Sequence, residues 1–329
     1  MKLISWNTTR KCHLKCKHCY RDAGEKDNRE LNFEEGKKLL DEIKESGFNI
    51  IIFSGGEPLL RDDIFDLVRH SKNIGLRPVF GTTGTTITRE IARELKEAGA
   101  LRMGISIDSK GPKLHDEFRQ VEGSFDDAIK GMENCKAEGL EFQLNTTVVE
   151  QNYDEFEEIT DLAVRLGAAA HHVFFLVPTG RAKDMEEEAL RQKQYEKLLH
   201  RILNKQKEVD IELKPTCAPQ FMRIADAKNM KMRFSRGCLA GLTYCCITPN
   251  GDVNPCPYLP VKVGNVLETS FTEIWNNSEM FNELRSEQLK GKCGICDYLE
   301  VCSGCRARAY YYSDGDYMAE DPWCSYKPR

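Results

Sequence analysis

The chain has 329 residues, of which 40% are hydrophobic and 30% charged, so it is long enough for one large domain and a smaller one. Its 47 basic and 52 acidic residues give a net charge of −5, which argues against a nucleic-acid-binding protein. The stretch MKLISWNTTRKC has no apolar run of signal-peptide length, and no segment approaches the roughly 20 apolar residues of a membrane helix. We therefore expect a cytoplasmic protein with no nucleic-acid or membrane partner.

The first two hundred residues alternate short β-branched runs with amphipathic segments of helical period, a pattern typical of a parallel sheet with crossover helices. The expected strands begin near Leu3, Asn49, Arg77, Leu101, Glu141 and Ala170. Capping boxes predict helix starts at three pairs: Asn32 with Glu35, Ser124 with Asp127, and Asn152 with Glu155. In the first of these helices, Leu39, Leu40 and Ile43 form the expected buried stripe.

Six strand-helix units are fewer than the eight of a closed TIM barrel, so we expect an open, partial (β/α)6 barrel over residues 1–215. Its ligands would bind at the carboxyl ends of the strands. A charged helix near residues 187–207 and a proline-containing stretch lead into an expected linker and helix at residues 216–234. Residues 235–329 are rich in Cys, Gly, Pro and Tyr, with a hairpin turn at Asn250-Gly251, and we expect a small domain folded around metal.

The 14 cysteines are hard to explain as disulfides in a reducing cytoplasm. Three lie between residues 12 and 19, nine lie between residues 238 and 324, and only Cys135 and Cys217 stand alone. Metal binding explains the two groups. We interpret Cys135 as a buried small apolar residue. Burial is also the simpler interpretation of Cys217, in LKPTCAPQFMRI, but its place just before the cysteine-rich region leaves its role open.

The segment CHLKCKHC places Cys12, Cys16 and Cys19 on the loop after the first strand. Three thiolates would hold a 4Fe-4S cubane and leave one iron open, as in catalytic rather than structural metal sites. The alternative is a zinc knuckle, in which His13 or His18 supplies the fourth ligand.

This C-x3-C-x2-C pattern resembles the signature of the radical S-adenosylmethionine (SAM) superfamily, and IIFSGGEP after the second strand resembles the glycine-rich SAM motif of that family. The resemblance implies that Gly55 and Gly56 let the backbone approach the methionine moiety of SAM and that Glu57 with Pro58 fixes the turn. It further implies reductive cleavage of SAM to a 5'-deoxyadenosyl radical at the open iron. Four weaker matches to the family are Thr83, Ser106, Asp108 and Arg119. The resemblance implies that Ser106 and Asp108 contact the ribose of SAM and that Arg119 binds its carboxylate.

The carboxyl-terminal cysteines resemble the SPASM extension, which carries one or two auxiliary 4Fe-4S clusters. One departure is the x2 spacing between Cys302 and Cys305, where many members have x3. The ligands that the resemblance implies are Cys238, Cys245, Cys256 and Cys305 for an inner cluster near the substrate, and Cys293, Cys296, Cys302 and Cys324 for an outer one. Cys245 is preferred to its neighbour Cys246 from the resemblance, since only one of two adjacent strand residues can face a cluster. A zinc ribbon is the alternative.

Over the whole chain the sequence resembles the tetrapyrrole-modifying SPASM enzymes, and among them the AdoMet-dependent heme synthases of the siroheme-dependent pathway. That resemblance implies oxidative decarboxylation of two propionates of Fe-coproporphyrin III to the vinyls of protoheme, with an auxiliary cluster accepting the surplus electron. A reduced ferredoxin or flavodoxin would donate electrons, and Arg181 and Lys183 are candidate cations for the propionates. Alternatives are acetate removal from didecarboxysiroheme, maturation of a peptide as in mycofactocin synthesis, and a non-catalytic iron-sulfur or zinc scaffold.

Overall fold

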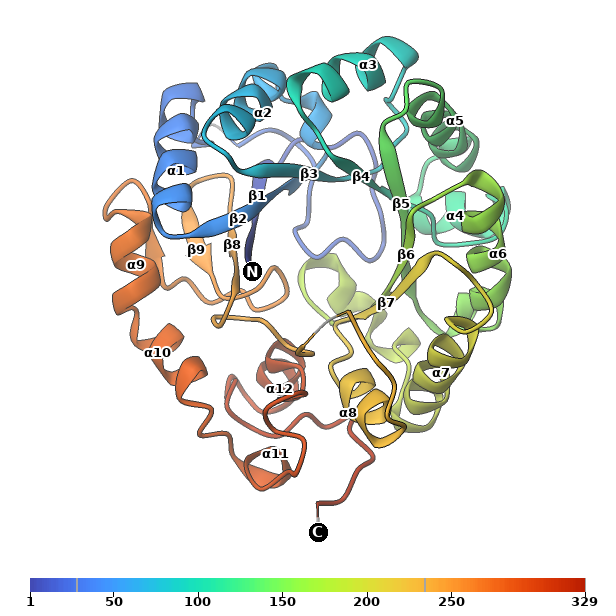
Figure 1. Ribbon diagram of the computed structural model, residues 1–329, viewed down its shortest axis with the longest axis vertical. Coiled ribbons are helices and arrows are strands. Elements are labelled where there is room, and N and C mark those ends of the chain that lie inside the picture. Colours follow the sequence, from blue (N-terminus) through green and yellow to red (C-terminus); the bar gives the residue numbers. More distant parts are fainter. Residues whose placement is uncertain (28, 234, 329) are drawn as a thin grey trace.

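The computed structural model describes residues 1–27, 29–233 and 235–328, so the predicted boundary at residue 234 and the final residue 329 lie outside the described residues. The described part contains one ten-stranded sheet, in the order β10-β9-β8-β1-β2-β3-β4-β5-β6-β7 (Figure 1). Strands β8 and β1 to β7 run parallel, and β9 and β10 are antiparallel additions at one edge. The strands are β1 (Lys2–Thr9), β2 (Phe48–Gly55), β3 (Arg77–Thr82), β4 (Arg102–Ser106), β5 (Glu141–Val148), β6 (Ala170–Phe175), β7 (Glu212–Thr216), β8 (Tyr244–Ile247), β9 (Asp252–Asn254) and β10 (Gly264–Asn265).

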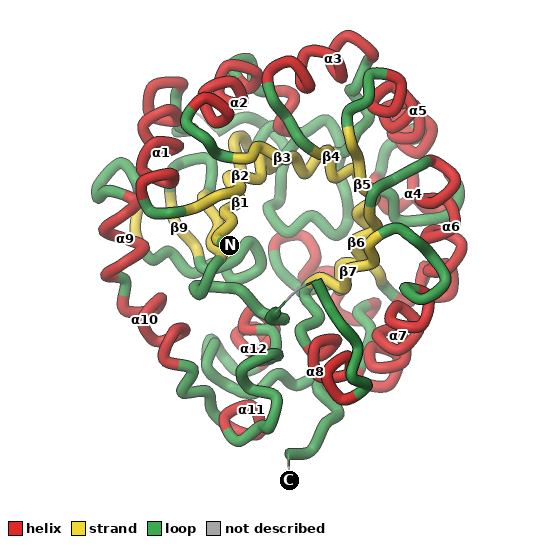
Figure 2. The backbone as a smooth tube through the Cα atoms, in the orientation of Figure 1, coloured by secondary structure: helices red, strands yellow, loops and turns green. Residues whose placement is uncertain are grey.

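Helices cover the outer side of this curved sheet, while the strands face the centre of the molecule (Figure 2). The α-helices are α1 (Phe33–Glu45), α2 (Ile64–Asn73), α3 (Arg89–Ala98), α4 (Pro112–Arg119), α5 (Ser124–Ala137), α6 (Phe156–Leu166), α7 (Gln192–Lys205), α8 (Gln220–Ala227), α9 (Phe271–Asn277), α10 (Glu279–Ser286), α11 (Gly291–Gly294) and α12 (Arg306–Tyr312). Short 3-10 helices are η1 (Pro58–Leu60), η2 (Glu150–Glu155) and η3 (Gly180–Glu188). The expected open, partial barrel is thus confirmed.

The main apolar core lies between the sheet and its helices. Ile4 and Trp6 of β1 are fully buried in it, and so is the predicted stripe of α1, Leu39, Leu40 and Ile43. Because side chains alternate along a strand, the residues between them, Ser5 and Asn7, face the inside of the barrel. This alternation decides which side chains can reach a bound substrate.

All six predicted strands exist and start within one residue of the expected positions. The barrel also contains β7, which the sequence analysis assigned to a proline-containing stretch. Pro215 is tolerated there because β7 is the edge strand, where a missing backbone N–H leaves no ladder bond unmade. Strand β8 of the cysteine-rich region pairs with β1, so this region extends the barrel sheet itself.

One of the three predicted capping boxes is confirmed. Asn32 and Glu35 cap α1 reciprocally. Ser124 is instead the first residue of α5, and its hydroxyl donates to Asp116 Oδ1 at 2.9 Å. Asn152 lies inside η2, where its Oδ1 accepts from a backbone N–H and its Nδ2 donates to a carbonyl at 2.7 Å. Ser124 and Asn152 thus bond with residues outside the predicted capping boxes, and so neither side chain caps a helix as predicted.

Within the described residues, no helix has the length and apolarity needed to cross a membrane.

Candidate active site

The three amino-terminal cysteines lie on a loop that leaves the carboxyl end of β1. Cys12 N donates to Gly24 O at 2.8 Å, which closes the loop on itself. Arg181 holds it from the other side: its Nε donates to Cys16 O at 3.0 Å, and its Nη1 donates to Ala23 O at 2.8 Å. The side chain that the sequence offered as a substrate cation therefore fixes the shape of the cysteine loop.

The thiols of this loop lie near one another, and that of Cys16 is buried. Burial raises the pKa of the Cys12 thiol to about 12, and the negative charges of Glu57, Cys16 and Cys19 add to this effect. Burial also raises the pKa of Cys16, against the opposing effect of Arg119. Thiols such as those of Cys12 and Cys16, whose pKa burial raises, are suited to a metal cluster, because ligation removes their protons and compensates their charge.

Arg119 and Asp108 form a buried ion pair beside these thiols. Arg119 Nε donates to Asp108 Oδ2 at 2.7 Å, and its Nη1 lies 3.6 Å from Cys16 Sγ. Asp108 Oδ1 accepts from Thr147 N at 2.8 Å. Burial acts to lower the pKa of Arg119, but Asp108 and Cys16 raise it above its ordinary value. The sequence predicted separate SAM contacts for the two residues, whereas the structure pairs them and directs the cation at a cysteine thiol.

Glu57 connects the carboxyl ends of β2 and β3. Its fully buried carboxylate accepts from Thr82 Oγ1 at 2.7 Å, from Thr83 N at 2.8 Å and from Thr83 Oγ1 at 2.7 Å. It also accepts from Leu59 N at 3.2 Å, so the turn role predicted for Glu57 is confirmed. Ser106 Oγ donates to Thr82 O at 3.3 Å. Protein donors thus occupy the Glu57 carboxylate, and the predicted SAM contacts of Thr83 and Ser106 stay predictions.

The two glycines before Glu57 let β2 approach the cysteine loop. A Cβ at Gly55, whose φ is +135°, would lie 2.5 Å from Thr9 O, and one at Gly56 would lie 2.2 Å from Lys11 O. In that space Gly56 N donates to Thr9 O at 2.8 Å. Any side chain here would push the two segments apart, so the glycines position the loop, and their approach to SAM stays a prediction.

The four cysteines assigned to an outer cluster surround one pocket of about 360 Å³: Cys293, Cys296, Cys302 and Cys324. Backbone N–H groups already point at two of the sulfurs. Asp321 N donates to Cys293 Sγ at 3.4 Å, and Tyr298 N donates to Cys296 Sγ at 3.5 Å. Such N–H donors to sulfur are among the contacts by which proteins tune iron-sulfur clusters.

Three of the four cysteines assigned to the inner cluster also come together, with one unexpected companion. Burial raises the pKa of Cys256 well above its usual value, and the thiolates of Cys217, Cys305 and Cys238 raise it further. Cys217, whose role the sequence leaves open, therefore lies beside this group, and Cys305 and Cys238 in turn raise its pKa.

Cys245, which the resemblance assigns to the inner cluster, lies on the core face of the sheet, and its role as a ligand stays a prediction. It pairs with Ile4 across β8 and β1, shares its face of the sheet, and is fully buried in the apolar core. The groups that shift its pKa, after burial itself, are Cys246 and Arg285. Its neighbour Cys246 points inside the barrel, where Arg21 Nη2 donates to its sulfur at 3.1 Å.

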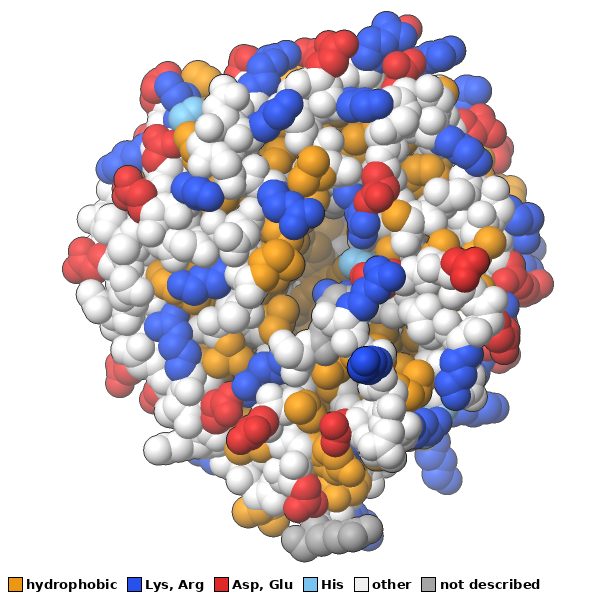
Figure 3. Space-filling view, viewed as in Figure 1, with side chains coloured by type: hydrophobic (Ala, Val, Ile, Leu, Met, Phe, Trp, Pro, Cys, Tyr) orange, Lys and Arg blue, Asp and Glu red, His pale blue; other side chains and the backbone are white. Residues whose placement is uncertain are grey.

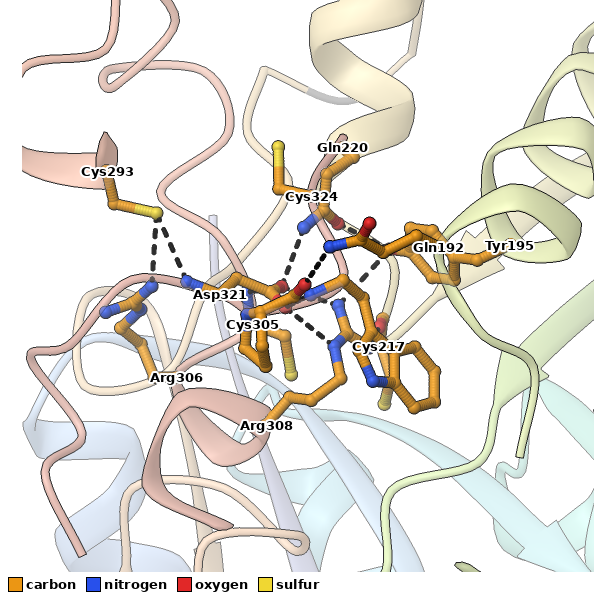
Figure 4. A network of polar contacts seen from close by, with 12 residues as sticks. Gln192, Tyr195, Cys217, Gln220, Cys293, Cys305, Arg306, Arg308, Asp321 and Cys324 are labelled. Atoms are coloured by element: carbon orange, nitrogen blue, oxygen red, sulfur yellow. Dashed lines mark hydrogen bonds and ion pairs between the residues drawn. The ribbon is translucent and has the colours of Figure 1, made fainter. Parts of the chain in front are cut away.

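A buried ion pair supports the inner group (Figure 4). Arg308 and Asp321 are both fully buried, and Arg308 Nη2 donates to Asp321 Oδ2 at 2.6 Å. Burial alone would raise the pKa of Asp321, but Arg308 and other donors lower it to about 2. Arg308 Nη1 also donates to Cys217 O at 2.7 Å, and Cys305 N donates to Asp321 Oδ2 at 2.8 Å. The pair therefore links two of the clustered cysteines.

The geometry gives no support to the zinc alternatives. Among the residues that the structure describes, no three His, Cys, Asp or Glu side chains converge closely enough to hold a single metal ion. A cubane binds each thiolate at a different iron, so its ligands stand farther apart than those of one ion. Of the proposed zinc ligands, His13 Nε2 bonds with Thr85 Oγ1 at 2.6 Å, and the His18 ring stacks on Phe118 with centroids 4.3 Å apart. The cysteine groups fit iron-sulfur clusters better than zinc.

Comparisons with known proteins agree with this arrangement. Residues 6–163 match the radical SAM superfamily, and residues 238–306 match the SPASM iron-sulfur cluster-binding domain. The AdoMet-dependent heme synthase of Methanosarcina barkeri is 44% identical over 99% of this chain and 97% of that protein. The Fe-coproporphyrin III synthase of the same organism is 32% identical over 98% of this chain and 87% of that protein.

Among solved structures, Streptococcus suis SuiB bound to S-adenosylmethionine has the same fold, with a TM-score of 0.79 and 20% identity over 98% of this chain and 77% of SuiB. The two matched domains imply 4Fe-4S clusters and SAM as cofactors, which the cysteine groups described above fit. The chain belongs to the radical SAM superfamily and is a radical SAM enzyme with a SPASM iron-sulfur domain.

Proposed function

We propose that this enzyme oxidatively decarboxylates two propionates of Fe-coproporphyrin III to vinyl groups and thereby makes protoheme. The observation that carries the proposal is the full-length similarity to AdoMet-dependent heme synthases, which spans both the barrel and the cysteine-rich region. In this reaction each propionate loses one hydrogen atom, one carbon dioxide and one electron. A reduced ferredoxin or flavodoxin is our proposed electron donor, and the free cysteines suit a reducing compartment such as the cytoplasm.

We assign Cys12, Cys16 and Cys19 to the cluster at which SAM binds. The bound cluster and SAM supply the radical that removes hydrogen from the substrate. The chain contributes orientation and charge: Arg181 fixes the loop, and Arg119 offsets the negative charge of the thiolates. We further propose that SAM lies against the backbone of Gly55 to Glu57 and the side of the barrel that carries Ser106.

The inside of the barrel supports a substrate rich in carboxylates. Figure 3 shows this face hollowed at its centre, with Lys and Arg side chains around the opening. Arg21 lies at the inner face of β1 and β8, where its Nη2 contacts Cys246 Sγ at 3.1 Å and its cation lies 5.6 Å from the Tyr20 ring centroid. Its buried Nε has no hydrogen-bond partner, and no carboxylate of the described residues pairs with it.

An arginine whose buried Nε is unsatisfied and which has no carboxylate partner is costly, so an anionic ligand explains it best. We propose that Arg21 binds a propionate of the porphyrin. A guanidinium holds a carboxylate through two parallel hydrogen bonds, and this would orient the macrocycle below the radical source.

The test is turnover of Fe-coproporphyrin III by anaerobic enzyme with SAM and a reductant, followed by mass spectrometry. We expect a product that has lost two carboxyl groups, and one deoxyadenosine formed for each group lost. The Fe-coproporphyrin III synthase relative makes acetate removal from didecarboxysiroheme the second candidate. Turnover of didecarboxysiroheme or a peptide, with Fe-coproporphyrin III unchanged, would overturn the first proposal.

A further inference from the structure

We infer that Cys217 is the fourth ligand of the inner auxiliary cluster, with Cys238, Cys256 and Cys305, and that Cys245 is not a ligand. This assignment differs from the ligand set that sequence resemblance implies. It concerns the auxiliary cluster alone, so it does not depend on which substrate the enzyme uses.

The register of β8 excludes Cys245. Strand β8 pairs in parallel with β1 so that Ile4 opposes Cys245 and Ser5 opposes Cys246. Ile4 and Cys245 are both fully buried in the core between sheet and helices. Turning Cys245 toward the other cysteines would require a one-residue slip of β8, which would move every side chain of the strand to the opposite face. That slip would also expel Ile247 from the core.

Cys246 faces the correct side of the sheet but is engaged elsewhere. Its sulfur accepts from Arg21 Nη2 at 3.1 Å and from Asn7 Nδ2 at 3.3 Å. Both donors belong to the barrel interior. The sulfur of Cys246 is therefore already engaged by two protein donors.

Cys217 is held among the inner cysteines by contacts that do not involve its thiol. It follows directly after β7 with a φ of +60°, a conformation that a residue with a side chain adopts only where its surroundings impose it. Its carbonyl accepts from Arg308 Nη1, and Arg308 pairs with Asp321, which in turn accepts from Cys305 N at 2.8 Å. Figure 4 shows Cys217 and Cys305 near this same arginine side chain.

The chain before Cys238 packs against the segment that follows Cys217. A Cβ on Gly237 would lie 2.5 Å from the side chain of Pro219, so the two segments are in direct contact. Cys238 N also donates to Cys302 O at 3.3 Å, which brings it to the loop that leads to Cys305. Three separate parts of the chain thus converge on one place, and each brings a thiol.

Four thiolates leave no iron of a cubane open. The inner cluster then has no free coordination site for a substrate carboxylate or a second SAM, in contrast to the three-cysteine cluster. A cluster held in this way would supply electron transfer alone, and Cys217 would connect the end of β7 to it.

The test uses the full chain in a background without the SAM cluster, Cys12→Ala/Cys16→Ala/Cys19→Ala, so that only auxiliary iron is measured. Cys217→Ala and the matched control Cys245→Val are reconstituted anaerobically in that background and analysed for iron, sulfide and Mössbauer spectrum. We expect Cys217→Ala to lose up to about half of the auxiliary iron, or to keep a cubane with one iron that lacks a thiolate. Valine suits the apolar site of Cys245, so Cys245→Val should keep the iron content and spectrum of the background.

The inference is overturned if Cys217→Ala matches the background, or if Cys245→Val loses iron or thiolate coordination. Cys245→Val also decides the matter where Cys217→Ala does not fold, since a full complement of four-thiolate cubanes in this variant excludes Cys245 as a ligand. Cys246→Ala is the third arm. Loss of the inner cluster in Cys246→Ala would overturn the assignment in favour of Cys246, and retention supports Cys217.

Discussion

Asp321→Asn should destabilise the enzyme strongly, because Asp321 is the shared acceptor beneath the inner cysteines. Its Oδ2 accepts from Arg308 Nη2 at 2.6 Å, Gln220 Nε2 at 2.7 Å and Cys305 N at 2.8 Å, and its Oδ1 accepts from Arg308 Nε at 2.9 Å. Asparagine keeps the shape but leaves the fully buried Arg308 cation without its counter-charge. Removing one partner of a buried ion pair costs about 3–5 kcal/mol. For a chain of this length that corresponds to a fall in Tm of about 4–7 °C.

The assay is anaerobic thermal unfolding of the cluster-loaded enzyme, with iron content measured beside it. Glu133→Gln, which breaks an exposed pair with Lys130, is the matched control and should change the free energy of unfolding by less than about 0.5 kcal/mol. A double-mutant cycle with Arg308→Met separates the pair from its surroundings, since the double variant should lose less than the two single losses combined. If Asp321→Asn unfolds at the temperature of the control, the ion pair does not stabilise this region.

Three further predictions concern the active site. Cys16→Ala should abolish deoxyadenosine formation while leaving the auxiliary clusters in place, and a normal deoxyadenosine yield would refute the assignment of the SAM cluster. Arg119→Met removes a cation 3.6 Å from Cys16 Sγ and leaves Asp108 without its ion-pair partner. The cluster should then be harder to reduce in a potentiometric titration, and SAM cleavage should be about tenfold slower or worse, which corresponds to about 1.4 kcal/mol. An unchanged potential would show that the guanidinium does not act on the cluster. Arg21→Met should weaken binding of Fe-coproporphyrin III about tenfold or more, as expected for loss of one charge-assisted contact, and should leave SAM binding unchanged. Equal weakening of SAM binding would contradict the assignment of Arg21 to the porphyrin site.

The barrel was predictable because its information is local. The spacing of hydrophobic residues predicts both the strands and the helices of a parallel sheet, and the six predicted strands start within one residue of their predicted positions. Strand β7 escaped detection because Pro215 suggests a linker unless the strand is known to lie at the edge. The pairing of β8 with β1 escaped for another reason: Cys245 and Ile4 are partners separated by most of the chain, and no local pattern encodes such a pairing.

The parts of the candidate site that form a continuous sequence motif could be predicted. The parts in which polar side chains bond with residues distant in the sequence could not. Cys12, Cys16 and Cys19 form a local motif, and the structure keeps them together on one loop. Asp108 and Arg119 looked like ligand contacts, yet the structure pairs them across 11 residues. The sequence shows which residues have side chains that can bind a ligand, but only the fold shows which of these side chains already bond with another part of the protein.

Each cysteine group is accompanied by a buried arginine, and the partners of these arginines indicate their different roles. Near the SAM cluster and the inner group, Arg119 and Arg308 are paired with aspartates, so a carboxylate offsets part of the positive charge of each. Arg306 lies 3.8 Å from Cys293 Sγ, its Nη1 donates to two backbone carbonyls, and its buried Nε has no hydrogen-bond partner. No carboxylate of the described residues pairs with it, so its positive charge acts on the outer group without a counter-charge. A nearby cation stabilises the more negative, reduced state of a cluster, so the outer cluster should accept electrons more readily than ligand type alone would predict. Arg21 lacks both a carboxylate and a full set of acceptors among the described residues, which is why we propose it as the partner of a substrate carboxylate.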